Sequence, residues 1–126
     1  MTMPKPGKMN EIAEQMLSTQ IQIIALQEIR WKGHGQMKKN EYSLYYSCSQ
    51  QSMGQPGTGF MVRKEVEKNI MSFTPINERI CILRLKRKFY NITLINVRAP
   101  TEEKMEEEKD KFYDDLQEVY DKSAKT

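Results

Sequence analysis

The chain has 126 residues, of which 38% are hydrophobic and 29% charged, and this composition is typical of one small globular domain. No stretch reaches the apolar length of a membrane span, and the amino terminus lacks the apolar core of a signal peptide. We therefore predict an intracellular protein, nuclear or cytoplasmic, without a membrane partner. Cys48 and Cys81 are far apart and have no His or Cys neighbours at metal-ligand spacing, so we predict reduced thiols that serve in packing.

Charge is distributed unevenly along the chain. The net charge is +3, but residues 1–101 carry 15 basic against 7 acidic side chains, and residues 102–126 carry 5 against 10. A basic body suits a polyanionic partner, because neutralising phosphates releases counterions. Solubility alone would also explain it, so charge favours nucleic acid only slightly.

The first two predicted elements are a helix and an apolar segment. Apolar residues spaced by three and four predict an amphipathic helix over residues 8–19. Residues 21–30 follow as a β-branched apolar run, which favours a strand buried on both faces, although periodicity leaves a buried helix open. Glu28 stands at the carboxyl end of this run. Ligands and catalytic groups collect at that edge of layered α/β folds, whereas a bare acid there is more often a solvated strand end.

The middle of the chain alternates in the manner of short strands. We expect a loop over residues 31–35, which holds the single histidine, His34, between two glycines. We expect strands over residues 41–48, 59–63, 68–73, 80–86 and 91–97, with a polar loop at 49–58 and a hairpin turn at Arg87 and Lys88. A charge-rich helix over residues 102–122 follows, for which Thr101 is the expected amino cap.

Four short sequence motifs follow one another along the chain: LQEIRWKG at 26–33, GTGF at 57–60, INERI at 76–80 and NITLINVRAPT at 91–101. Together they resemble the endonuclease/exonuclease/phosphatase superfamily, the DNase I-like fold of exonuclease III, and within it the retrotransposon-derived endonucleases of LINE type. The glycines of the second motif permit close backbone approach, and the remaining glycine and helix of a dinucleotide-binding loop are missing.

The resemblance implies an α/β (α+β) fold, a partial DNase I-like four-layer sandwich. From it we expect a single truncated domain over residues 1–126 that lacks the first strand and the carboxyl-terminal half. We expect mainly one sheet of mixed strand direction, two outer helices and an exposed inner face, since half a sandwich leaves its core side uncovered.

The resemblance also implies a site. Glu28 matches the family's metal-binding glutamate for Mg²⁺ or Mn²⁺, and Asn96 would lie beside it and orient the site by hydrogen bonding. Arg98 stands where the family usually has histidine or tyrosine against the scissile phosphate. An arginine can bind phosphate there but cannot exchange protons at neutral pH. His34 is not assigned to the family's catalytic histidine, which belongs near the far carboxyl end of the domain.

Further residues are expected to contact nucleic acid, with DNA favoured over RNA. Arg30 and Lys32 can neutralise phosphates and Trp31 can stack on a base, although Trp31 can equally plug the end of the sandwich. Arg84 and Arg98 belong to a span from Arg79 to Thr101 that contains no acid.

Three functions therefore remain open. The first possibility is that the chain is a fragment of a magnesium-dependent endonuclease. That fragment would be incomplete, because the family's Gly-Asp-Phe-Asn and Ser-Asp-His motifs have no counterpart in it. Alternatively it is a non-enzymatic nucleic-acid-binding remnant. The third reading is an interaction protein whose exposed sheet pairs with a second copy or another chain.

Overall fold

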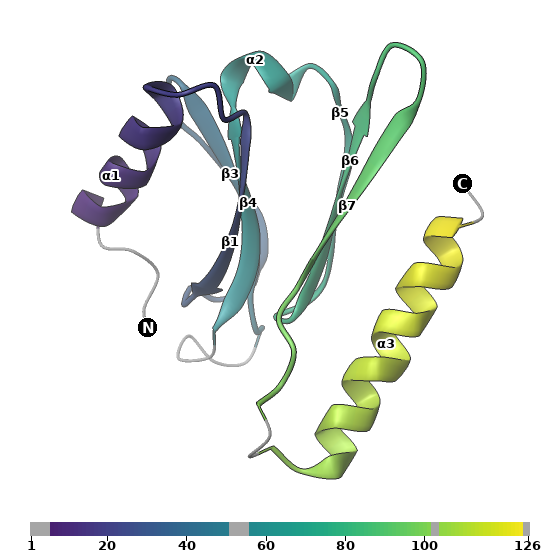
Figure 1. The fold of residues 1–126 in the computed structure, drawn as a ribbon. Coiled ribbons are helices and arrows are strands. Elements are labelled where there is room, and N and C mark those ends of the chain that lie inside the picture. Colours follow the sequence, from purple (N-terminus) through teal and green to yellow (C-terminus); the bar gives the residue numbers. More distant parts are fainter. Residues whose placement is uncertain (1–5, 51–55, 102–103, 125–126) are drawn as a thin grey trace.

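The computed structural model of the chain describes residues 6–50, 56–101 and 104–124, and these form four layers of helices and sheets (Figure 1). In chain order the elements are α1 (Pro6–Leu17), β1 (Ile23–Ile29), β2 (His34–Lys38), β3 (Tyr42–Ser47), β4 (Gly57–Arg63), α2 (Lys64–Glu67), β5 (Ile70–Asn77), β6 (Ile80–Lys86), β7 (Asn91–Val97) and α3 (Glu106–Ala124). The expected α+β class, with sheets and outer helices, is confirmed.

The seven strands divide into two antiparallel sheets. The first sheet has the order β1-β4-β3-β2 and the second β5-β6-β7. The short helix α2 and the turn after it carry the chain from β4 in the first sheet to β5 in the second. The expectation of mainly one mixed sheet is therefore wrong, because this crossing ends the first hydrogen-bonded ladder and starts another.

The inner faces of the two sheets cover each other. Phe60 and Val62 of β4 pack against Leu83 and Leu85 of β6, and Tyr45 of β3 joins them. All five are at most 7% exposed. Burial of such side chains contributes roughly 1.5–3 kcal/mol each. The predicted exposed inner face is thus wrong: the second sheet supplies the cover that was expected to be missing.

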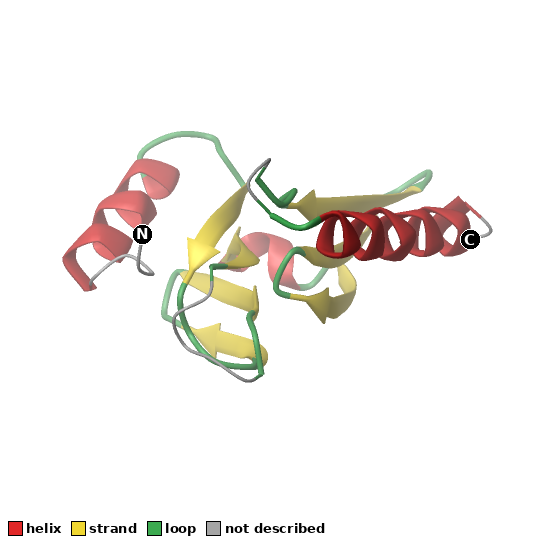
Figure 2. Ribbon diagram, turned by 90° about the horizontal axis from the view of Figure 1, so that it is seen from below, coloured by secondary structure: helices red, strands yellow, loops and turns green. Residues whose placement is uncertain are grey.

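Helices lie on both outer faces. Ala13 and Met16 of α1 contact Leu44 and Met61, which point outward from the first sheet because side chains alternate along a strand. On the other side α3 buries its apolar stripe, Phe112, Leu116 and Val119, against Ile80, Ile82, Ile95 and Val97. Figure 2 shows these two helices at opposite ends of the layer stack.

One arginine ties α1 to the first sheet. The guanidinium of Arg63, at the end of β4, donates hydrogen bonds through Nη1 to the carbonyl oxygens of Met16, Thr19 and Ile21. Carbonyls at a helix end have no partner within the helix, and a cation there also complements the helix dipole. The strand thus fixes where the helix stops.

Several elements differ from expectation: β4 begins at Gly57 inside the expected loop, the helix α2 was not expected, and β5 runs on to Asn77. The stretch at 34–38, expected to begin inside a loop, is the edge strand β2. The strand β1 borders only β4 in the described chain, and Ala25 is exposed, so β1 is not buried on both faces. Helix α3 begins at Glu106, after a turn in which Lys104 N donates to Thr101 O, so Thr101 is not its amino cap.

Both cysteines are reduced and buried, as predicted. Burial raises the pKa of the Cys48 thiol and raises that of Cys81 to about 11, so both are protonated at neutral pH. They act as small apolar packing groups. None of the helices in the described part of the chain is long and apolar enough to cross a membrane.

Candidate functional site

The two sheets are joined by side-chain hydrogen bonds where β1 and β7 end. Asn96 of β7 is 5% exposed, and its Nδ2 donates to Leu26 O at 2.9 Å and to Gly59 O at 2.8 Å. Gln27 Nε2 of β1 donates back across the gap, to Asn96 Oδ1 at 3.4 Å and to Val97 O at 2.8 Å. Asn96 therefore holds the carboxyl ends of β1 and β7 together, while its expected part in orienting a catalytic site stays a prediction.

Glu28 follows Gln27 at this junction. The pairing of β1 with β4 shifts register between Gln27 and Ile29, so the backbone is irregular at Glu28. Such bulges re-aim side chains at the rims of sheets. The side chain of Glu28 lies outside the described part of the structure, so its predicted metal contact stays a prediction.

Close backbone approach beneath this junction requires a glycine. A Cβ atom on Gly59 would lie 2.4 Å from Tyr45 O and 2.7 Å from Ile29 Cδ1. The main chain of β4 can therefore lie this close to β3 and to Ile29 only without a side chain at this position. This is the function expected for the glycines of the GTGF motif.

Two arginines lie at the same edge. Arg98 Nη2 donates to Pro56 O at 3.0 Å, and the backbone of Arg98 donates to Arg79 O at 2.8 Å. Arg79 is 8% exposed, and its guanidinium donates to Arg98 O and pairs with Glu108 of α3 at 3.5 Å. Protein oxygens thus hold both guanidinium groups in place at this edge.

A recess of about 500 Å³ opens at the same end of the sandwich. It is lined by residues from the ends of β3 and β5 and by the acids Glu78 and Glu108, with His34 on its rim. Ser47 Oγ donates to Asn77 O at 2.6 Å and closes the sheets against each other there.

The residues expected to bind nucleic acid do not form one surface. Trp31 is half-buried and meets Tyr46 edge to face, with ring centroids 4.9 Å apart, so it packs on the outer face of the first sheet. Lys32 is exposed, and Arg30 is half-buried directly after β1.

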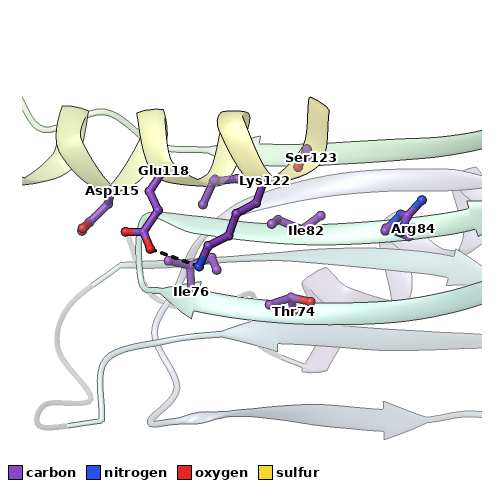
Figure 3. Close-up of a pocket in the computed structure, with 9 residues that line it drawn as sticks. Thr74, Ile76, Ile82, Arg84, Asp115, Glu118, Lys122 and Ser123 are labelled. Atoms are coloured by element: carbon purple, nitrogen blue, oxygen red, sulfur yellow. Dashed lines mark ion pairs between the residues drawn. The ribbon is translucent and has the colours of Figure 1, made fainter. Parts of the chain in front are cut away.

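Arg84 lies apart from Asn96. It points from β6 to the outer face of the second sheet, into a cavity of about 310 Å³ beneath α3 (Figure 3). Asn96 points to the inner face. Lys122 and Glu118 of α3 form an ion pair of 3.0 Å across this cavity. The structure thus brings together Gln27, Asn96, Arg98 and Arg79 and leaves Arg84 on another surface.

The sequence analysis did not predict that Gln27 and Arg79 make hydrogen bonds at this edge. Both stand inside the motifs that carried the family resemblance, but neither a glutamine in a strand nor an arginine in a turn signals a contact 70 or 19 residues away. Only the meeting of the two sheets reveals these pairs.

Magnesium binding at this edge stays a prediction. Among the described side chains no cluster of three His, Cys, Asp or Glu could hold a metal ion. Magnesium does not need such a cluster, since it is commonly held by one or two carboxylates, with waters and substrate phosphates. Here Glu28 would supply the carboxylate, and the amide oxygens of Gln27 and Asn96 are neighbouring oxygen donors.

Fold and site define a class: a four-layer α/β sandwich with a polar, arginine-bearing edge at the carboxyl ends of β1 and β7. No family model matches the chain, and no solved structure matches it. The chain is 34% identical over 120 residues to craniofacial development protein 2 of Tragulus javanicus, a match that covers 95% of this chain and 21% of that protein. The bovine protein of the same name, from Bos taurus, is 33% identical over 120 residues, with 95% and 20% covered.

The chain is therefore homologous to craniofacial development protein 2 over nearly all its length. The four motifs of the sequence analysis also resemble that protein, and the comparison confirms this resemblance. The chain spans about a fifth of the length of these curated relatives.

Proposed function

We propose that the chain is part of a magnesium-dependent phosphodiesterase of the endonuclease/exonuclease/phosphatase superfamily, of retrotransposon origin, which acts on nucleic acid inside the cell. The observation that supports it best is the bridge made by Asn96. It joins the end of β1, which carries Glu28, to the end of β7, which carries Arg98. The sequence motifs that resemble the superfamily thus converge in space.

In this proposal some residues of the edge bind the metal ion and the phosphate, and another holds the strand ends in position. Glu28 would hold Mg²⁺ or Mn²⁺, an ion that polarises a bound phosphate when present. Arg98, with Arg79 beside it, would bind phosphate oxygens, and Asn96 would hold both strand ends in place. Arg79, Arg98 and Asn96 offer no base that could take a proton from water, because a guanidinium is a cation and an amide is neutral. The proposal is therefore of a half-site that binds and orients a phosphodiester and turns it over poorly alone.

Binding of manganese tests this proposal without requiring turnover. Free Mn²⁺ can be followed by electron paramagnetic resonance in the wild-type chain and in Glu28→Gln, which keeps the size of the side chain and removes its charge. We expect Glu28→Gln to weaken Mn²⁺ binding at least about tenfold, since even indirect metal contacts are worth that much. Glu11→Gln, an exposed change on α1, is the matched control and should bind as the wild type does.

Duplex DNA binding completes the experiment. Affinity should rise when magnesium replaces EDTA, and Glu28→Gln should abolish the rise. If Glu28→Gln and the wild type bind Mn²⁺ equally, the metal site is refuted.

A second candidate is nucleic-acid binding without catalysis. The hydrogen bond that holds Arg79 beside Arg98 favours it, because two neighbouring guanidinium groups suit a polyanionic partner without any catalytic step. If the chain only binds nucleic acid, its affinity for DNA should fall steeply with salt concentration and should change neither with magnesium nor in Glu28→Gln. The protein-interaction alternative rested on an exposed sheet face, and that face is covered.

A further inference from the structure

The hairpin between β6 and β7 ends in a turn that no other element covers. Lys86 pairs with Asn91 as the last rung of the ladder, and Arg87 N donates to Tyr90 O at 2.9 Å to close the turn. Figure 1 shows this turn projecting past the end of α3. The β6–β7 ladder runs from Lys86 and Asn91 at the turn to Ile80 and Val97 at its other end, where Asn96 and Arg98 lie. It is thus separate from the candidate site described above.

Two aromatic rings at this turn are largely exposed to solvent and take no part in the core. Phe89 is 85% exposed and Tyr90 is 62% exposed. Lys88 Nζ lies 5.3 Å from the centre of the Phe89 ring. Exposed rings that gather with cations on one turn indicate a binding surface more than a chance exposure.

The turn is also strongly basic. Lys86, Arg87 and Lys88 are consecutive and exposed. From Lys68 to Thr101 the sequence has one acid, Glu78, and it lies at the β5–β6 turn at the far end of these strands. A polyanion can therefore approach the hairpin without meeting a carboxylate of its own sheet.

The surface beside the rings is hollow. A recess of about 580 Å³ is lined by Asn69, the three cations, Phe89 and Tyr90. The backbone oxygen of Asn69 accepts a hydrogen bond from Lys86 N at 2.7 Å. The side-chain amide of Asn69 has no hydrogen-bond partner among the described residues, and Asn69 lines the recess. A lipid surface would favour a convex apolar tip, whereas a recess with rings, cations and an amide suits one nucleotide with its base stacked and its phosphate paired.

We propose that the tip of the β6–β7 hairpin binds single-stranded nucleic acid. Phe89 and Tyr90 stack on unpaired bases, and Lys86, Arg87 and Lys88 neutralise the flanking phosphates. Duplex DNA fits less well, because its bases are stacked inside the helix and are not available to the rings. This site is independent of Glu28 and needs no metal ion.

Fluorescence anisotropy with a labelled 12-residue oligothymidylate tests the proposal in the presence of EDTA, so that metal binding at Glu28 has no part in the result. We expect the wild type to bind this strand more tightly than a duplex of equal length. The double variant Phe89→Ala/Tyr90→Ala should weaken binding of the single strand by roughly tenfold or more. The matched control Tyr113→Ala/Tyr120→Ala removes two exposed rings from α3 and should bind as the wild type does.

The salt dependence of binding tests whether the basic side chains of the turn contact phosphates. Arg87→Gln/Lys88→Gln should lower the slope of log affinity against log salt by about 1.4, since each phosphate contact on a single strand contributes about 0.7. Lys38→Gln/Lys39→Gln, which changes two exposed lysines at the end of β2, is the control.

Two results would overturn the proposal. One is single-strand affinity that survives Phe89→Ala/Tyr90→Ala in a variant whose thermal unfolding is unchanged. The other is binding to vesicles of phosphatidylcholine with phosphatidylserine that requires Phe89 and Tyr90, without binding to the oligonucleotide. The second result would assign the hairpin to a membrane surface.

Discussion

Asn96 illustrates how one residue can decide whether two sheets meet. It is buried between β1, β4 and β7 and its amide donates to one carbonyl oxygen of β1 and one of β4. In Asn96→Ala these two oxygens lose the hydrogen bonds from Asn96, and the loss of hydrogen bonds at a buried site costs about 1–3 kcal/mol. We expect Asn96→Ala to lower the free energy of unfolding by about 2–3 kcal/mol in urea denaturation.

The control for this variant is another asparagine of the same strand. Asn91 is exposed at the start of β7, so Asn91→Ala should change the free energy of unfolding by less than about 0.5 kcal/mol. Equal stabilities of the two variants would mean that the bridge between the sheets contributes nothing.

At the scale of elements, α3 is an amphipathic helix whose sequence looks almost entirely polar. Eleven of its residues are charged, yet Phe112 and Val119 are 4% and 5% exposed against the second sheet. Phe112→Ala should destabilise the chain by about 3 kcal/mol, because it removes a buried ring and leaves a cavity. Tyr120→Ala, whose ring is 64% exposed on the same helix, should cost less than about 0.5 kcal/mol.

Thermal unfolding followed by circular dichroism measures both variants. If Phe112→Ala proves as stable as Tyr120→Ala, α3 does not form the fourth layer in solution.

The strands show which elements a local pattern can predict. The strands β6 and β7 begin and end where the sequence placed them, since their alternating apolar residues face a core on one side and a helix on the other. The strand β2 was missed because His34, Gln36, Met37 and Lys38 are exposed at the edge of a sheet. An edge strand gains its hydrogen bonds from a neighbour without burying side chains, so its sequence carries little pattern.

For the whole molecule, the covered inner faces predict one cooperative folding unit. Trp31 is the single tryptophan and packs on the first sheet, whereas α3 packs on the second and contributes strongly to far-ultraviolet circular dichroism. We expect tryptophan fluorescence and circular dichroism to give the same urea midpoint. Phe60→Ala, which opens a cavity between the sheets, should lower both midpoints together.

Separate midpoints for the two probes would contradict the sandwich. They would indicate that each sheet folds with its own helix and that the interface between the sheets is weak.

The sequence by itself determined the α+β class, most of the strands and the residues whose motifs resemble the superfamily, because these depend on local periodicity and on the order of short motifs. It also determined that Cys48 and Cys81 pack as thiols. The tertiary structure alone decided that the strands form two sheets, that these cover each other, and that Gln27, Asn96, Arg79 and Arg98 meet at one edge while Arg84 does not. The physical reason is that each of these outcomes depends on contacts between residues far apart in the chain, such as Asn96 with Leu26, which no local pattern encodes.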